Sequence, residues 1–367
     1  MNREKKIIQT SIIGVIGNVL LVAAKAFVGF LANSISIITD ALNNLSDALS
    51  STITIIGTKL SGKKPDKKHP FGHGRIEYVT SLIIGILVLV AGITAIYESI
   101  MTLIEKPEVK YDISSIIIIS SAIVVKIGLG VYFQLVGKKT NSEPLKASGK
   151  DALFDALLSV ATVIGIVTTL VWNVNIEGYI GILIGLFIIK SAIEIIRKGA
   201  SLIIGERTDQ ETVNNIKKIV CSFKEVKGAY DLIINNYGSG KAIASVHVEV
   251  DDSLTAREIH HFTRQITEKV FMETGTIITV GIYAKNEANE EIKKIKSLVM
   301  KRAEENKFIK QVHGFYVDDE RNTITFDLVI EFECPNPKEV IATMTKELKE
   351  KYPNYDYYVV QDNDFTD

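Results

Sequence analysis

The sequence predicts a six-helix transmembrane bundle followed by an α+β tail made of two ferredoxin-like-type αββαβ units. Two observations lead to this prediction. Residues 1–205 contain long apolar runs, whereas the rest of the chain has the charge content and apolar periodicity of a soluble protein. In that soluble part the same order of elements occurs twice, which divides it into domains 206–285 and 286–367.

Six segments are apolar and long enough to cross a bilayer, because a membrane helix needs roughly 20 apolar residues. The expected spans are 7–30, 35–58, 77–104, 113–136, 149–172 and 177–203. Lys and Arg concentrate at the N-terminus, in the second and fourth links and after the last span, and only Lys106 and Lys110 clearly fall on the other side. The positive-inside rule therefore predicts a multi-pass protein of the cell membrane with both termini in the cytoplasm.

The tail is expected to form two sheets, each covered by helices on one face. The first unit should contain helix 209–223, strands 228–237 and 241–250, helix 254–273 and strand 276–284. The second should contain helix 287–306, strands 311–318 and 322–333, helix 336–351 and strand 355–361. This order is the same in both units, so the second is interpreted as a repeat of the first.

Composition narrows the classes of function. The formal net charge of -1 gives no reason to expect a nucleic-acid partner. Cys221 and Cys334 are too few for a disulfide framework and too far apart for a CxxC metal site. The tail has no Gly-rich phosphate loop and no Ser/His/Asp arrangement, so we expect neither an enzyme nor a permanent cofactor.

Ionisable residues within the expected spans are the strongest functional signal, because charge at membrane depth is costly and usually marks a pathway. In the second span Asn43 and Asp47 are four residues apart and share a helix face, and Asp40 lies close to the same stripe one turn earlier. In the fifth span Asp151 and Asp155 also share a face. If the two faces meet, Asn43, Asp47, Asp151 and Asp155 converge, with Asp40 as an accessory group on the pathway.

Three clustered carboxylates repel one another and resist desolvation, so they need a cation, protons or water. A set of oxygen ligands without nitrogen or sulfur favours a hard divalent ion. Manganese fits best, and ferrous iron and zinc stay open because selectivity also depends on geometry. The alternative is that some of these acids lie near a helix end and are simply solvated.

The link between the second and third spans contains a second candidate site. Asp66, His69 and His73 offer one oxygen and two nitrogen ligands, enough for a peripheral metal ion. The alternative is a solvated basic loop whose histidines contact lipid headgroups or cap the third helix.

At these residues the chain resembles the cation diffusion facilitator family over nearly its whole length. The resemblance rests on the Asp-Ala-x-Asn-x-Leu-Ser-Asp pattern of residues 40–47 and on the His-Pro-Phe-Gly-His-Gly-Arg-Ile-Glu run of residues 69–77. It implies a homodimer that exports a divalent cation in exchange for protons by alternating access. The combination of Asn43 with Asp151 is similar to the manganese-exporting branch, and family members look as if they bind a peripheral metal at the positions of Asp66, His69 and His73.

The resemblance also implies that domain 206–285 is a regulatory or dimerisation domain. In related zinc carriers this domain looks as if it holds a binuclear zinc site, and His247 and His260 occupy positions that match its ligands. Tyr230 replaces an expected histidine, and Gly281 to Tyr283 replace an acidic and imidazole pair, so His247 and His260 are weak candidates with a structural role expected. His313 stands at the repeat's counterpart of Tyr230, where we expect it to be isolated and structural. The second repeat departs from the family plan.

Two other classes of function share part of this pattern. A cation channel would use the same acidic quartet without proton coupling, because rings of acids can select cations. A membrane-anchored metal sensor would use the tail as its output module. Flux that runs uphill against a metal gradient separates a transporter from both.

Overall fold

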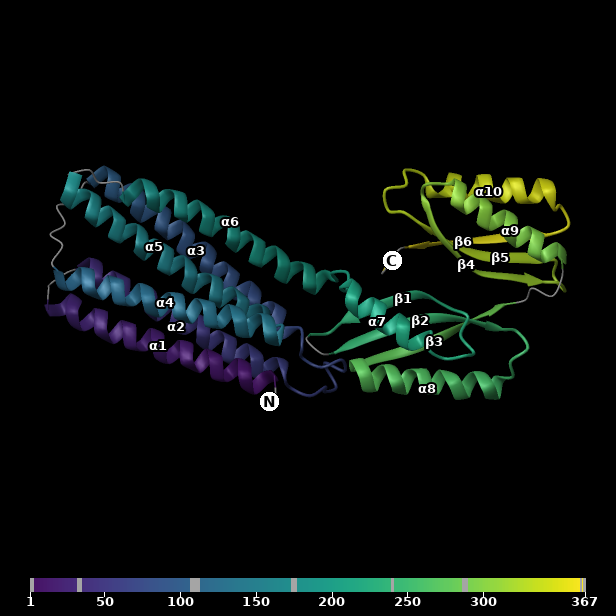
Figure 1. The fold of residues 1–367 in the computed structure, drawn as a ribbon, viewed down its shortest axis with the longest axis horizontal. Coiled ribbons are helices and arrows are strands. Elements are labelled where there is room, and N and C mark those ends of the chain that lie inside the picture. The colour runs from purple at the N-terminus through teal and green to yellow at the C-terminus, as the bar shows by residue number, and fades with distance from the viewer. Residues whose placement is uncertain are drawn as a thin grey trace. The chain divides into compact units, whose positions relative to one another are not determined.

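The computed structural model describes residues 3–31, 35–105, 113–172, 177–238, 241–285, 290–363 and 365. The chain divides into two compact units, the first mainly residues 1–206 and the second mainly residues 207–367. Figure 1 shows helices in the first unit and helices with sheets in the second.

The described part of the first unit forms six long helices. They are α1 (Arg3–Leu31), α2 (Ile35–Ser61), α3 (Ile76–Glu105), α4 (Ile113–Thr140), α5 (Glu143–Trp172) and α6 (Glu177–Ile204). α1 packs along α2, α3 along α6, and α4 along α5 (Figure 1). α2 and α5 also contact each other, which brings together the two helices that carry the acidic pairs.

Large apolar side chains point outward from this bundle, as lipid-facing residues do. They include Leu20, Phe27, Val124 and Leu183, each more than 60% exposed. Over the described residues, four segments have the length and hydropathy to cross a membrane: Arg3–Phe27, Ile76–Ile104, Ser120–Thr140 and Gly178–Ile204. The sequence predicts six spans, and the two helices whose described residues give no such segment, α2 and α5, are those that carry the acids.

Close contact between α4 and α5 depends on glycine. A Cβ atom at Gly149 would lie 3.0 Å from the backbone nitrogen of Gln134, and one at Gly130 would lie 3.1 Å from the carbonyl oxygen of Gly149. Small residues allow such backbone approach between membrane helices. At one end of the bundle Arg3 donates to Glu77 at 2.7 Å and to the carbonyl of Thr140 at 2.7 Å, which joins α1 to α3 and α4.

The first repeat of the tail follows the bundle. It contains α7 (Gln210–Val220), β1 (Gly228–Asn236), β2 (Ala242–Asp251), α8 (Ala256–Thr274) and β3 (Thr276–Lys285). β1 pairs antiparallel and β3 parallel with the central β2. Asp209 caps α7, and a capping box of Thr255 with Glu258 starts α8, as polar N-terminal caps generally do.

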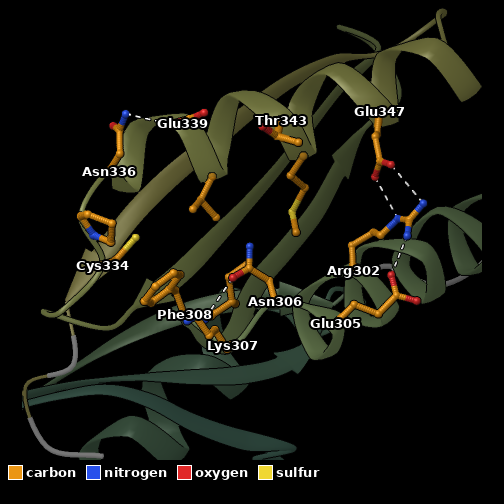
Figure 2. Close-up of a pocket in the computed structure, with 14 residues that line it drawn as sticks. Arg302, Glu305, Asn306, Lys307, Phe308, Cys334, Asn336, Glu339, Thr343 and Glu347 are labelled. Carbon is orange, nitrogen blue, oxygen red and sulfur yellow. Dashed lines mark hydrogen bonds and ion pairs between the residues drawn. The ribbon is translucent and has the colours of Figure 1, made fainter.

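The second repeat has the same order and pairing. It contains α9 (Glu290–Glu305), β4 (Ile309–Asp318), β5 (Thr323–Ile330), α10 (Pro337–Lys351) and β6 (Asp356–Asn363), with β5 central. Between α9 and α10 the surface is hollowed, and Figure 2 shows Arg302 directed at Glu305 and Glu347 in this hollow. Both carboxylates neutralise Arg302 at this part of the hollow, whose lining also includes Lys307.

Each sheet buries one face under its own helices. In β2 the residues Ala244, Val246, Val248 and Val250 alternate into the first core, and in β5 Ile324, Phe326 and Leu328 alternate into the second. The intervening residues, such as His247 and Asp327, therefore lie on the opposite faces, because side chains alternate along a strand.

Both sheets have an irregularity at equivalent points of their first strands. The register shifts after Tyr230 in β1 and after His313 in β4. The next residue has positive φ in each case, 52° at Asp231 and 62° at Gly314. A β-bulge of this kind changes the direction of the neighbouring side chains. In both sheets these side chains lie next to the sheet face that is not covered by the helices of its own repeat.

Candidate metal sites

The helix bundle contains a cluster of three carboxylates. Asp47 comes from α2, and Asp151 and Asp155 come from adjacent turns of α5. One carboxylate oxygen from each lies within 4.8 Å of the others, close enough to hold one ion. The structure thus brings together three of the four residues that the sequence predicts for the intramembrane site.

The side chains of Asn43 and Asp40 lie outside the described part of the structure, which gives only their backbone within α2. The described contact between α2 and α5 continues next to the cluster through hydroxyl groups. Ser50 lies 3.4 Å and Thr54 3.5 Å from Ser148, measured between side-chain oxygens. These buried hydroxyls fix the two helices against each other beside the acids.

Lys126 of α4 is a member of this cluster that the sequence reasoning missed. Its ammonium group bonds to Asp47 and, at 2.8 Å, to Asp155, and only 3% of its side chain is exposed. A lysine within an apolar span was itself a detectable signal, because intramembrane charge is costly and usually functional. The cluster therefore combines three acids with one internal cation.

The loop between α2 and α3 gathers its predicted ligands. Asp66 Oδ1 lies 3.4 Å from His69 Nδ1, and Asp66 Oδ2 lies 3.4 Å from His73 Nε2. The backbone N–H of His69 donates to Asp66 at 2.8 Å and lowers the pKa of that carboxyl. The Nδ1 atom of His73 is buried and makes no hydrogen bond to any described residue. Lys63, with its ammonium 3.6 Å from Asp66, competes with an ion for the carboxylate.

The tail contains a third cluster, between its two repeats. Asp231 of β1, His313 of β4 and Asp327 of β5 each offer a ligand atom within 4.8 Å of the others. Asp231 Oδ2 accepts hydrogen bonds from His247 Nδ1 at 2.8 Å and from the Tyr283 hydroxyl at 2.6 Å. The rings of Tyr230 and His313 stack with centroids 5.2 Å apart.

The close contacts among these side chains shift the pKa values of several groups in the tail cluster. Burial acts to raise the pKa of Asp231, but the hydrogen bonds that it accepts from His247 and its other neighbours outweigh burial and hold this pKa well below its usual range. The bond to Asp231 also raises the pKa of His247. Burial and the nearby Asp231 raise the pKa of Asp362 to about 6.

The predictions for the tail histidines have different outcomes. His247 joins the third cluster through Asp231, whereas His260 lies exposed on α8, outside the metal-ligating groups found among the described residues. The prediction that His313 is isolated was wrong, because its side chain is fully enclosed and its Nε2 atom lies 2.6 Å from Asp231 Oδ1. Sequence reasoning missed Asp231, Asp327 and Asp362, since acids at polar positions of strands are ordinary and only the packing of two repeats unites them.

Comparison with protein families matches most of the chain. Residues 11–204 match the family model described as the cation efflux transmembrane domain. Residues 208–282 match the model described as the cation efflux protein cytoplasmic domain. The second repeat lies beyond both matched ranges.

Curated relatives align with 68–77% of the chain. An uncharacterised transporter of Methanocaldococcus jannaschii is 30% identical over 68% of this chain and 88% of its own length. Two manganese efflux system proteins of Bacillus subtilis, MneP and MneS, are each 26% identical. MneP covers 77% of this chain and 96% of itself, and MneS covers 71% and 89%.

Proposed function

This chain belongs to the cation efflux family, and from that membership we propose that it exports a divalent metal ion, manganese in particular, in exchange for protons. The observation that carries the proposal is the group of three carboxylates from α2 and α5 with ligand atoms within 4.8 Å of one another. Asn43, one turn before Asp47, adds a neutral oxygen ligand in this proposal.

Two arguments support manganese as the cargo. Carboxylate and amide oxygens suit hard ions such as Mn²⁺ better than they suit zinc or copper, which favour imidazole and thiolate. MneP and MneS, which resemble this chain, are named as manganese efflux proteins. Zinc and ferrous iron are the alternative cargoes within the same fold.

The formal charges of the cluster support exchange for protons. Asp47, Asp151 and Asp155 contribute -3 when ionised, and Lys126 contributes +1. One divalent ion brings the sum to zero, and so do two protons. Because protons compete with metal for the same carboxylates, metal affinity falls as the acids are protonated, and a site that alternates between these two neutral states couples the two fluxes.

Lys126 has a specific part in this cycle. Its ammonium shares Asp47 and Asp155 with the incoming ion, so binding requires it to give up at least one of these contacts. When the ion leaves, the ammonium returns and keeps two of the acids compensated. In this proposal Lys126 acts as a positioning residue that limits how tightly the cargo is held.

The remaining parts follow the same proposal. α1 to α6 all span the membrane, with both termini in the cytoplasm; of the residues used for this orientation, Lys106 and Lys110 lie outside the described part of the chain. Asp66, His69 and His73 hold a peripheral metal ion on the cytoplasmic side, and Asp40 lies on the pathway. Two chains form a homodimer through the first repeat, since this region matches a family named for dimerisation.

Transport in proteoliposomes tests this proposal. Manganese, zinc, iron, cobalt and cadmium are compared under one imposed pH gradient, with metal and proton fluxes recorded together. We expect manganese to move fastest, against its own gradient, with two protons per ion. Metal flux that only runs downhill would indicate a channel, and no flux of any ion would favour a membrane-anchored metal sensor.

A further inference from the structure

We infer that the tail binds a divalent transition-metal ion between its two repeats, with Asp231, His313 and Asp327 as ligands. His313 Nε2 lies 2.6 Å from Asp231 Oδ1 and 3.8 Å from Asp327 Oδ2. Ligand bonds of about 2.0–2.2 Å, typical of zinc, place neighbouring ligand atoms about 3–4 Å apart. These three atoms therefore need only small shifts to surround one ion.

Two of the three proposed ligand atoms, His313 Nε2 and Asp231 Oδ1, have no hydrogen-bond partner among the described residues. The His313 side chain is 0% exposed, and neither of its ring nitrogens makes a hydrogen bond to a described residue. The same holds for Asp231 Oδ1, so its 2.6 Å approach to His313 lacks the alignment of a hydrogen bond. Buried polar atoms normally have partners because leaving them unpaired costs free energy, and a metal ion supplies one to both.

The neighbouring side chains orient the ligands. His247 and the Tyr283 hydroxyl both bond to Asp231 Oδ2, which leaves Oδ1 directed at His313. The Tyr283 oxygen also lies 2.7 Å from Asp327 Oδ2. A phenol carries one proton, so it donates to one of these carboxylates at a time while holding both near the ion. Outer hydrogen bonds of this kind are common around metal ligands and strengthen binding.

Charge and chemistry define the ion. Asp362 Oδ2 lies 3.7 Å from His313 Nε2, so three carboxylates surround one imidazole. A divalent cation offsets this negative charge, and an imidazole nitrogen with carboxylate oxygens suits Mn²⁺, Fe²⁺ and Zn²⁺. His313, Asp327 and Asp362 belong to the second repeat, beyond the ranges that match the family models. The ion would thus fasten the added repeat to the shared one.

Metal binding to the full-length protein in detergent tests this inference without measuring transport. The background is the double variant Asp66→Ala/Asp155→Ala, which removes one ligand from each of the other two clusters. Equilibrium dialysis with Mn²⁺ alone or Zn²⁺ alone measures the bound equivalents. The electron paramagnetic resonance signal of bound Mn²⁺ then shows whether an imidazole nitrogen is coordinated. We expect one bound metal ion per chain, and the signal of bound Mn²⁺ should show coupling to an imidazole nitrogen.

Three variants in that background decide the outcome. Asp327→Asn, which is nearly isosteric, and His313→Gln should each lower the affinity for this ion by more than about tenfold. Tyr283→Phe should lower it by about 10–100-fold, as loss of an outer partner of a metal ligand does. The control His261→Gln, at an exposed position of α8, should bind as the background does. Circular dichroism with chelator present identifies variants that fold.

Two results would overturn the inference: a folded background protein that binds no equivalent with nitrogen coupling, or folded Asp327→Asn and His313→Gln proteins that retain it. If His313→Gln fails to fold, Asp327→Asn carries the test. Because the experiment records binding in the tail, its failure leaves the transport proposal untouched, and a failure of transport leaves this inference untouched.

Discussion

The carboxylate cluster of the bundle and the cluster of the tail each bring three ligand atoms within 4.8 Å, but they balance their charge by different means. In the bundle an internal ammonium, Lys126, bonds to two of the three acids. In the tail an imidazole stands among the acids, and His247 and Tyr283 donate hydrogen bonds to them. A cation that belongs to the protein competes with a metal ion, whereas a ring nitrogen can bind one.

This difference suits two tasks. A transport site has to release its cargo, and a resident positive charge keeps affinity moderate because like charges a few ångström apart repel strongly at low dielectric. A structural or regulatory site has to retain its ion, and outer hydrogen bonds increase retention.

Removal of an acid in the bundle should have the largest effect. Asp47→Ala and Asp155→Ala are each expected to reduce metal-driven proton flux in proteoliposomes to the level of empty liposomes, because each loses a charged ligand and leaves Lys126 underpaired. Ser159→Ala, one turn further along α5, should retain flux, since its hydroxyl bonds to the backbone carbonyl of Asp155 and not to its carboxylate in the described part of the structure. Normal flux in both acid variants would remove this cluster from the transport path.

Removal of the internal cation should change affinity in the opposite direction. Unit charges 4 Å apart interact by about 4 kcal/mol at an effective dielectric of 20, so Lys126→Met should tighten Mn²⁺ binding by at least about tenfold and slow its release. Calorimetric titration and transport rates measure the two effects.

Two further variants control for this substitution. Lys126→Arg keeps the charge and should bind metal close to the wild-type level, and Lys190→Met changes an exposed lysine of α6 and should alter neither quantity. Weaker Mn²⁺ binding in Lys126→Met would show that the ammonium supports the ion instead of competing with it.

Exchange of oxygen for nitrogen donors should make the bundle resemble the tail. Asn43→His combined with Asp151→His is expected to shift the preference toward zinc over manganese by about tenfold, because imidazole suits zinc and carboxylate oxygens suit manganese. Competition between the two ions during transport measures the ratio. An unchanged ratio would mean that groups outside this quartet select the cargo.

The smallest expected effect concerns the bulge that shapes the tail cluster. Gly314 has φ of 62°, and a side chain in the left-handed region costs about 1–2 kcal/mol. Gly314→Ala should therefore lower the unfolding temperature of the tail, measured with chelator present, by a few degrees. Gly314→Asn should lose less, since asparagine tolerates this conformation; equal losses would point to crowding against Tyr283 instead.

Secondary-structure elements were predicted from the sequence more completely than the tertiary contacts between them. The helix expected at 254–273 is α8, Ala256–Thr274, and the strand expected at 276–284 is β3, Thr276–Lys285. Apolar periodicity and caps are local, so they can be recognised without a structure. The pairing of Asp47 with Asp151 and Asp155 was accessible for the same reason, because polar groups four apart in apolar helices must face a common interior.

What escaped prediction depends on contacts between distant segments. Asp231 and Asp327 lie on the polar faces of two separate sheets, and only the register and bulges of those sheets bring their oxygens near His313. Nothing local distinguishes these acids from solvated ones. Lys126 differs, because a lysine within an apolar span is a local signal that can be recognised in the sequence. It was missed because the prediction of the site considered only the acidic residues and Asn43.

Because the two repeats of the tail belong to one chain, their sequences can differ, which is not possible for the two halves of a symmetric dimer. When two identical chains meet about a two-fold axis, each residue and its copy must serve both sides of the contact. Here Tyr230 and His313 occupy equivalent strand positions in one chain and stack on each other, so one half carries a phenol ring where the other carries an imidazole. A covalent pair of repeats can therefore evolve a lopsided pocket that a matched pair of subunits would have to build twice or not at all.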